Sequence, residues 1–318
     1  MAADGQRSLQ KAGPRRSQSL PSISSLSVAC LSRLLLRLSS PTPVGTHTLF
    51  SNSLTMHASP LLLALAALSS LSAVLATPTS FEGVAHIPRR NEAPVYKTCQ
   101  KRNTVALTFD DGPWKYENAL LNELDQAGAK ASFFVNGNNY GCIYDHAKSL
   151  RRAFNDGHLV GSHGWEHQDF TQLSRKQMHS ELARNERAFQ KILGVKPRYF
   201  RPPYGNLNND VLEVLNERGY RGVFLWNKDT KDADGAGADE GKRVYDNIMN
   251  AAPRSAMVLN HETIPGTVHR VMPYALPGLN HAGLRLVTAA ECSGHGSDPS
   301  NWYERVGGRE ERNDSWNC

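Results

Sequence analysis

The chain has no surplus of positive charge in the part that is expected to fold. Its 318 residues include 36 Lys and Arg and 30 Asp and Glu, a net charge of +6. Residues 1–76 hold six of the basic residues and one acid, which leaves 30 basic and 29 acidic residues, a net of +1, in residues 77–318. A protein that binds phosphate backbones needs clustered positive charge. The sequence therefore argues against a nucleic-acid-binding protein.

The N-terminal region also lacks an apolar run long enough to cross a membrane. The run Leu61–Ala76 has 16 residues, whereas a spanning helix needs about 20. It follows Met56 and ends in small residues, a pattern typical of a secretory signal peptide. We expect residues 56–76 to be this signal and the Ser- and Arg-rich residues 1–55 to be absent from the mature protein. The prediction is a secreted protein, extracellular or cell-wall associated, without stable membrane insertion once the signal is removed.

Cysteine is scarce, and its spacing excludes a structural zinc site. The chain has five cysteines and no Cys-x-x-Cys pair, the spacing that zinc modules use. Cys30 lies in the segment that we expect to be absent, so four cysteines remain. An even number in a secreted protein favours two disulfides.

From Cys99 onward, short apolar runs alternate with helical patterns. The predicted strands are 104–109, 131–135, 159–162, 198–200, 222–226, 256–259 and 284–287, and the predicted helices are 117–127, 147–156, a long one after Ser174, 210–218 and 244–251. This alternation indicates a parallel sheet. About seven strand–helix repeats in roughly 190 residues favour a barrel over an open sheet. We predict a single α/β domain over 99–292, with 77–98 as a linker or short propeptide and 293–318 as a C-terminal tail.

Barrel closure also predicts how the cysteines pair. Cys99 precedes the first predicted strand and Cys292 follows the last. Because closing a barrel brings its first and last strands together, we predict a Cys99–Cys292 disulfide. Cys142 and Cys318 are then paired by elimination.

Polar residues gather directly after the predicted strands. The groups are Asp110-Asp111-Gly112, Ser162-His163, Arg201-Pro202-Pro203-Tyr204, Asp229 and His261. In α/β barrels the carboxyl ends of the strands meet on one face, where catalytic residues lie. We therefore expect these groups to share a site.

The residue types in these groups suit metal-assisted hydrolysis. His163 and His167, four residues apart, and Asp111 would make an open site with three protein ligands. A bound Zn²⁺ lowers the pKa of its water to about 7 and polarises a carbonyl. Asp110 would then act as a base, held ionised by Arg201, and His261 would donate a proton to a departing amine.

Five ordered motifs resemble those of a known family. They are Thr108–Pro113 (TFDDGP), Ser162–His167 (SHGWEH), Arg201–Gly205 (RPPYG), Trp226–Asp232 (WNKDTKD) and Leu259–His261 (LNH). In this order the segment over roughly residues 99–292 is similar to the polysaccharide deacetylases, carbohydrate esterase family 4 with its NodB-like domain, and most similar to secreted fungal chitin deacetylases. Two positions differ from the family pattern: Ala233 stands where an aromatic is common, and Gly164 where Ser or Thr is common.

The resemblance implies a fold and a role for each motif residue. It implies a distorted (β/α) barrel and one divalent ion, Zn²⁺ with Co²⁺ as the alternative. The implied roles are Asp111, His163 and His167 as metal ligands, Asp110 as base, His261 as acid, Arg201 and Asp232 as their partners, the Tyr204 N–H on the oxyanion, and Trp226, Leu259 and Asp229 at the substrate.

The predicted reaction is hydrolysis of N-acetyl groups on GlcNAc polymers, such as chitin or its oligomers, by a monomeric enzyme that releases acetate and leaves glucosamine units. Two alternatives stay open. One is an O-acetyl esterase that acts on acetylxylan or another polysaccharide with the same metal site. The other is a chitin-binding effector with weak catalytic activity.

Overall fold

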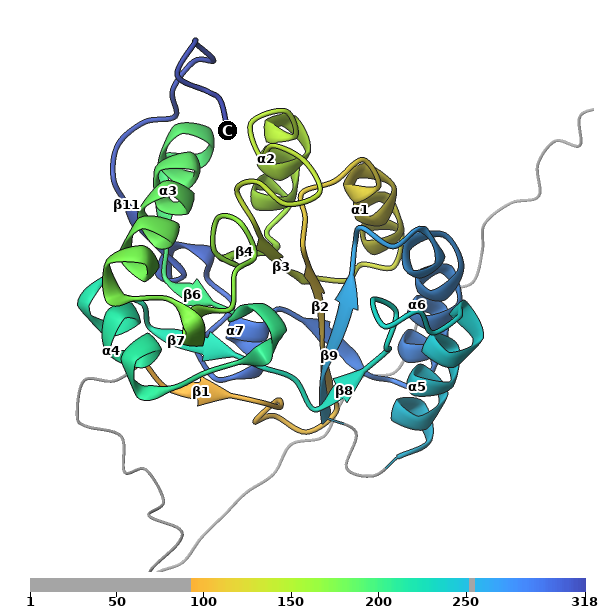
Figure 1. The fold of residues 1–318 in the computed structure, drawn as a ribbon. Helices are drawn as coiled ribbons and strands as arrows, with labels where there is room; N and C mark the ends of the chain where they lie inside the picture. The colour runs from red at the N-terminus through yellow and green to blue at the C-terminus, as the bar shows by residue number, and fades with distance from the viewer. Residues whose placement is uncertain (1–92, 252–254) are drawn as a thin grey trace, which may run out of the picture. The chain divides into compact units, whose positions relative to one another are not determined.

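Figure 1 shows the computed structural model of the chain, which describes residues 93–251 and 255–318. The predicted signal peptide 56–76, the upstream segment 1–55 and residues 77–92 of the predicted linker lie outside the described residues.

One parallel sheet organises the domain. Its strands are β1 (Val95–Tyr96), β2 (Thr104–Asp110), β3 (Ser132–Val135), β4 (Leu159–Ser162), β6 (Tyr199–Phe200), β7 (Gly222–Phe224), β8 (Lys228–Asp229), β9 (Ser255–His261) and β10 (Arg285–Val287). They lie in the order β1-β7-β6-β4-β3-β2-β9-β8, and β10 pairs with β2. This arrangement confirms the predicted α/β class. The strands beyond the predicted seven are β1 and β8, which have only two residues each.

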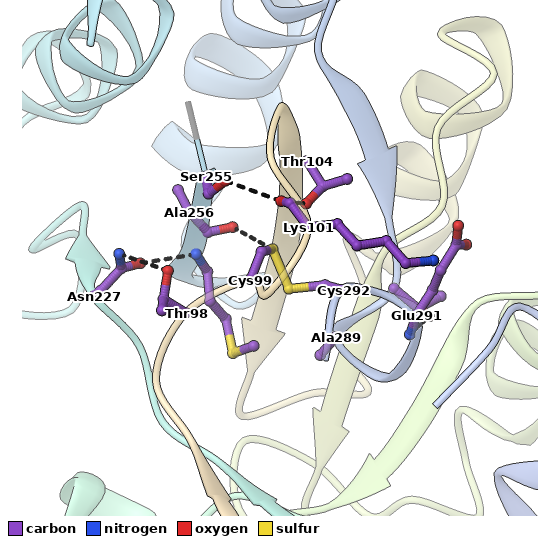
Figure 2. The surroundings of a disulfide bond; sticks show 12 residues. Thr98, Cys99, Lys101, Thr104, Asn227, Ser255, Ala256, Ala289, Glu291 and Cys292 are labelled. Carbon is purple, nitrogen blue, oxygen red and sulfur yellow. Dashed lines mark hydrogen bonds between the residues drawn. A yellow bond between two sulfur atoms is a disulfide. The ribbon is translucent and has the colours of Figure 1, made fainter. Parts of the chain in front are cut away.

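The sheet curls without closing fully. Its path ends at β1 and β8, which are not paired with each other in the described part of the chain. A side chain spans the gap instead: Asn227, next to β8, donates from Nδ2 to the Thr98 hydroxyl at 3.0 Å, beyond the end of β1 (Figure 2). The Asn227 Oδ1 also accepts from the Met257 N–H of β9 at 2.9 Å. The result is the distorted barrel that the family resemblance implies.

Helices cover the outside of the curled sheet (Figure 1). They are α1 (Glu117–Gln126), α2 (Ala147–Asn155), α3 (Arg175–Leu193), α4 (Asn209–Glu217), α5 (Ala238–Asn250), α6 (Met272–His281) and α7 (Ala289–Cys292), with 3₁₀ turns at Phe170–Gln172, Pro203–Gly205 and Pro299–Asn301 and a π-helical turn at Thr267–Val271. Ser174 caps α3, as its sequence predicts, in a reciprocal hydrogen-bond pair with Gln177. None of the helices in the described residues is both long and apolar enough to span a bilayer.

The core lies between the sheet and these helices. Every residue of β2 is buried, as expected for a central strand of a parallel sheet that is covered on both faces. A second apolar cluster lies between α3, α4 and strands β6 and β7, where Leu182, Val211 and Phe200 pack together. The main core and this second cluster together hold in place the carboxyl ends of the strands, which carry the polar groups of the predicted site.

The domain extends beyond the predicted limits at both ends. At its start, β1 pairs with β7. At its end, β11 (Tyr303–Arg305) pairs antiparallel with β5 (Val195–Pro197), and Trp302 and Trp316 are buried in the main core. Residues 293–318 are therefore part of the packed domain.

Two disulfides join distant parts of the chain. Cys99 is bonded to Cys292 with 4.7 Å between their Cα atoms, and Cys142 to Cys318 with 5.8 Å. These are the pairs that the sequence predicts. Figure 2 shows that the first bridge joins the segment entering β2 to the C-terminal end of α7. The second ties the chain terminus to the segment between β3 and α2.

Candidate active site

A cavity of about 360 Å³ opens at the carboxyl ends of the central strands. Asp110 ends β2 and His261 ends β9, and His163 directly follows β4. Nine of the predicted site residues line this cavity: Asp110, Asp111, His163, His167, Tyr204, Trp226, Asp229, Leu259 and His261. The remaining two, Arg201 and Asp232, lie against this set and contact Asp110 and His261. The structure thus brings together groups that are far apart in the sequence: Asp110 and His261 are separated by 151 positions.

Asp111, His163 and His167 have the donor atoms and spacing of a metal site. Their ligand atoms all lie within 4.8 Å of one another. The Asp111 Oδ1 lies 3.6 Å from the His163 Nε2 and 3.2 Å from the His167 Nε2. This buried oxygen has no hydrogen-bond partner among the described residues. A buried carboxylate oxygen that faces two imidazoles and lacks a donor fits a bound cation.

Burial sets the two imidazoles in the form that binds metal. It lowers the pKa of His163 far below its usual value, and the pKa of His167 to a lesser degree. Both rings are therefore neutral at pH 7, as metal ligation requires. The His163 Nδ1–H donates to the Arg201 carbonyl at 2.7 Å, which leaves the Nε2 lone pair directed at Asp111.

Asp110 is held by a fully buried arginine. The Arg201 Nη1 donates to the Asp110 Oδ1 at 2.8 Å and to the Thr108 hydroxyl at 2.6 Å. Its Nε and Nη2 donate to the carbonyls of Phe224 and Leu225, both at 3.0 Å. Burial raises the pKa of Asp110 to about 6, although the charge of Arg201 lowers it. The carboxylate is therefore ionised at neutral pH and fixed in direction.

His261 is held by an equally constrained carboxylate. The Asp232 Oδ1 lies 2.7 Å from the His261 Nδ1, while Oδ2 accepts from the His261 backbone N–H at 2.8 Å and from the Thr267 hydroxyl at 2.6 Å. Burial lowers the pKa of His261, but Asp232, with help from Asp110 and Asp111, outweighs it and raises the pKa to about 9. The imidazole is therefore protonated at pH 7.

Strained backbone is concentrated at this cavity. Five non-glycine residues of the described chain have positive φ, and four of them, Asp111 (70°), His167 (54°), Tyr204 (61°) and Lys231 (58°), line the cavity. This conformation costs free energy for an L-residue and persists where the surroundings impose it, most often at functional sites. The fold therefore stabilises an arrangement of this cavity that the local sequence does not favour.

Tyr204, Trp226 and Leu259 also line the cavity, and the Tyr204 ring packs edge-on against the His167 ring. Gly205 has a φ of 71°, and a Cβ there would lie 2.7 Å from the Trp226 ring, so only glycine allows this close approach. The Asp229 Oδ2 pairs with the Lys231 Nζ at 3.0 Å, and both residues line the cavity. Ala233 also lines the cavity, at the position where the family commonly has an aromatic.

Glu262 is a buried residue beside the site that the sequence pattern does not reveal. It follows His261, and its Oε1 accepts from the Trp114 N–H at 3.1 Å. A Cβ on Gly112 would lie only 1.6 Å from this oxygen, so the carboxyl group lies directly against the turn that carries Asp111. Burial and the nearby Glu117 raise the pKa of Glu262 well above its usual value. An acidic residue after a strand is common, so the sequence does not single out Glu262. Only its packing against the turn at Gly112 indicates that it supports the position of Asp111.

Comparisons with known proteins agree with this geometry. A family model described as polysaccharide deacetylase matches residues 97–223. A chitin deacetylase from Pestalotiopsis sp. is 37% identical over 223 residues, which cover 69% of this chain and 74% of that protein. A chitin deacetylase from Colletotrichum lindemuthianum is 33% identical over 246 residues, covering 74% of this chain and 96% of that protein. The solved structure of the chitin deacetylase from that fungal pathogen matches with a TM-score of 0.62 over 67% of this chain and 96% of its own.

Proposed function

The chain belongs to the polysaccharide deacetylase family, and from this membership we propose that it hydrolyses the N-acetyl groups of GlcNAc polymers such as chitin, with one bound divalent metal ion. As a member of this family it is a hydrolase that acts on amides. The observation that carries the proposal is the Asp111–His163–His167 cluster, two of whose members are buried and which shares its cavity with both Asp110 and His261.

Asp111, His163 and His167 would hold the ion. Two imidazole nitrogens and one carboxylate oxygen are a donor set that suits Zn²⁺ and leaves a coordination position open. Co²⁺ is the alternative with the same ligand preference. When bound there, the cation would lower the pKa of a water molecule and polarise the acetyl carbonyl.

Asp110 is proposed as the base that takes the proton of the attacking water. It is adjacent to Asp111, and its Oδ2 lies 3.9 Å from the His163 Nε2, so it borders the place where the water would react. Arg201 keeps the carboxylate oriented through the 2.8 Å hydrogen bond to Oδ1, which leaves Oδ2 free to accept the proton. General-base catalysis requires this fixed, ionised carboxylate.

His261 is proposed as the acid that protonates the departing nitrogen. Its Nδ1 is engaged by Asp232 at 2.7 Å, so Nε2 is the nitrogen left for the substrate. Because its pKa is raised to about 9, it carries a proton at neutral pH. Asp110 and His261 thus have opposite protonation states, as a base and an acid at one site require.

The remaining predicted residues would bind the acetylated sugar. We propose that the Tyr204 N–H stabilises the oxyanion, for which its positive φ of 61° sets an unusual amide direction. Trp226 and Leu259 would enclose the acetyl methyl, and Asp229, paired with Lys231, would contact the sugar. The chitin deacetylase names of the relatives support chitin as the polymer.

Secretion is proposed with this function. The signal-like run Leu61–Ala76 precedes a domain that carries two disulfides, and disulfides persist mainly in oxidising compartments. A polymer of the cell wall is also reached from outside the cell.

Acetate release from defined substrates tests the proposal. With added Zn²⁺, we expect release from GlcNAc oligomers, loss of release on chelation, and loss in the Asp110→Asn variant. Release from acetylxylan with none from GlcNAc oligomers would replace the proposal with an O-acetyl esterase. Binding of chitin without any release would replace it with a chitin-binding protein.

A further inference from the structure

The loop between the two cavity histidines is held by a buried carboxylate of α3. This histidine loop comprises residues 163–167. The Glu181 Oε2 accepts from two consecutive backbone N–H groups of the loop, those of Trp165 and Glu166, each at 2.8 Å. Glu181 is only 5% exposed. Two adjacent N–H groups that converge on one oxygen form an anion-binding nest, here occupied by a side chain of the protein itself.

Two buried asparagines hold the carbonyls of the same loop. Asn185, one helical turn after Glu181 on α3, donates from Nδ2 to the Gly164 carbonyl at 2.9 Å and to the Val135 carbonyl at 3.2 Å. Asn136, after β3, donates to the His163 carbonyl at 2.6 Å. The loop is therefore bonded through both its N–H groups and its carbonyls, and it is connected to α3 and to the end of β3.

The histidine loop needs such support because its backbone is unusual. Gly164 has a φ of 79° and His167 a φ of 54°, so the loop does not continue as a helix or a strand that would satisfy its own polar groups. An unsatisfied buried N–H costs about 1–3 kcal/mol. Glu181 removes this cost for the buried Trp165 N–H and also binds the half-buried N–H of Glu166. A charged acceptor makes the stronger kind of hydrogen bond.

His163 and His167 are oriented in different ways. The His163 ring donates to the Arg201 carbonyl. In residues 93–251 and 255–318 the His167 ring has no carbonyl partner of this kind; it contacts Asp111 and packs against the rings of His163 and Tyr204. The direction of His167 therefore depends on its backbone, and so on the loop.

We propose that Glu181 and Asn185 are positioning residues that preform the histidine loop and thereby set the affinity of the site for a divalent metal. The inference rests on the proposed function, because it takes Asp111, His163 and His167 as the ligands. Neither Glu181 nor Asn185 would touch the metal or the substrate. Both act on the ligand His167 through the backbone, so their loss should weaken metal binding before it alters any other property.

The test compares two isosteric variants on one helix. Glu181→Gln keeps the size of the side chain but removes the charge that holds the two N–H groups. Glu186→Gln is the matched control, because Glu186 is also buried on α3, at 9% exposure, and pairs with Arg218 at 2.6 Å instead of the loop. The Zn²⁺ dissociation constant of the full chain is measured for each variant by competition with a chromophoric chelator. A Co²⁺ absorption spectrum reports the ligand geometry independently of activity.

We expect Glu181→Gln to weaken Zn²⁺ binding about 10- to 100-fold, the usual effect of losing a residue that supports a metal ligand, and to change the Co²⁺ spectrum. Asn185→Ala should also weaken Zn²⁺ binding and change the Co²⁺ spectrum. Glu186→Gln should have the Zn²⁺ affinity and the Co²⁺ spectrum of the unchanged protein. Unaltered Zn²⁺ affinity in folded Glu181→Gln would overturn the inference, as would an equal loss in Glu186→Gln. Absence of Zn²⁺ binding in the unchanged protein would instead overturn the proposed function.

Discussion

The charge of Asp232 is the main reason that His261 is protonated at neutral pH, and the variant Asp232→Asn isolates this effect. The asparagine keeps the shape of the side chain and can still accept from the Thr267 hydroxyl, which Asp232 does at 2.6 Å. It removes the negative charge that lies 2.7 Å from the His261 Nδ1. Burial of His261 remains, and burial lowers its pKa.

The size of the effect follows from the pKa of His261, which is raised from 6.5 to about 9. A difference of about 2.5 pH units corresponds to about 3 kcal/mol. Asp110 and Asp111 contribute part of the increase. We therefore expect the pKa of His261 to be about one to two pH units lower in the variant than in the unchanged protein. An acid must carry its proton to react, so kcat falls as pH rises through this pKa. The alkaline limb of the kcat profile should therefore move to lower pH.

The assay is the pH profile of kcat for acetate release from GlcNAc oligomers. It is measured at a fixed, saturating concentration of Zn²⁺, so that the site of every variant is fully occupied and carries the same charge from the ion. Asp246→Asn is the matched control, because its carboxylate accepts from Tyr274 at the surface between α5 and α6. It should leave the limb in place. A folded Asp232→Asn variant with an unmoved alkaline limb would refute the reasoning and assign Asp232 a structural role only.

The same pair predicts how stability depends on pH. The folded-state pKa of His261 lies above its unfolded value, so its contribution is fully present below pH 6.5 and is lost as pH rises through about 9. Burial raises the pKa of Asp232, but its hydrogen bonds with His261 and Thr267 prevail and lower it; that contribution is present above pH 3.8 and is lost on acidification. Urea unfolding should therefore give the largest difference between unchanged protein and Asp232→Asn between about pH 4 and 6.5.

Three further predictions concern the metal, the base and the disulfide. His163→Ala should lose stoichiometric Zn²⁺, measured by metal analysis after dialysis, because it removes a buried ligand; full Zn²⁺ content would contradict the assignment. Asp110→Asn should keep the metal and lose at least about a hundredfold in kcat, the usual contribution of a general base; activity near that of the unchanged enzyme would exclude Asp110 as the base. Cys99→Ser with Cys292→Ser should lower the free energy of unfolding by up to about 5 kcal/mol, from the chain-entropy model for a bridge over 193 residues, and an unchanged urea midpoint would show that the bridge does not restrict the unfolded chain.

Most of the fold could be predicted from local patterns. Strands such as β4 (Leu159–Ser162) are short apolar runs, and α3 has both a capping serine and an apolar face. The helix α6 does not follow such a pattern, because Pro277 and Gly278 lie inside it and both disfavour helix. Its packing against α1 and α5 overrides that local preference, so only the folded protein reveals it.

The sequence by itself determined which chemical groups the site contains. Asp110, Asp111, His163 and His261 stand at the ends of predicted strands, with His167 four residues after His163, and parallel strands direct their carboxyl ends to one face. Alternation of strand and helix therefore implied that these groups meet. The cysteine positions implied the bridge between Cys99 and Cys292, since these residues flank the first and last predicted strands, which pair as β2 and β10.

Only the tertiary structure decided how these groups are held. The Glu181 contact with the histidine loop, the Glu262 carboxyl against Gly112 and the burial of Trp316 each join segments that no short pattern connects. The pKa values of Asp110 and His261 likewise depend on burial and on charges brought close by folding. Local sequence specifies residue types and backbone preferences over a few positions, whereas desolvation and hydrogen-bond partners depend on the distances that the packed core imposes.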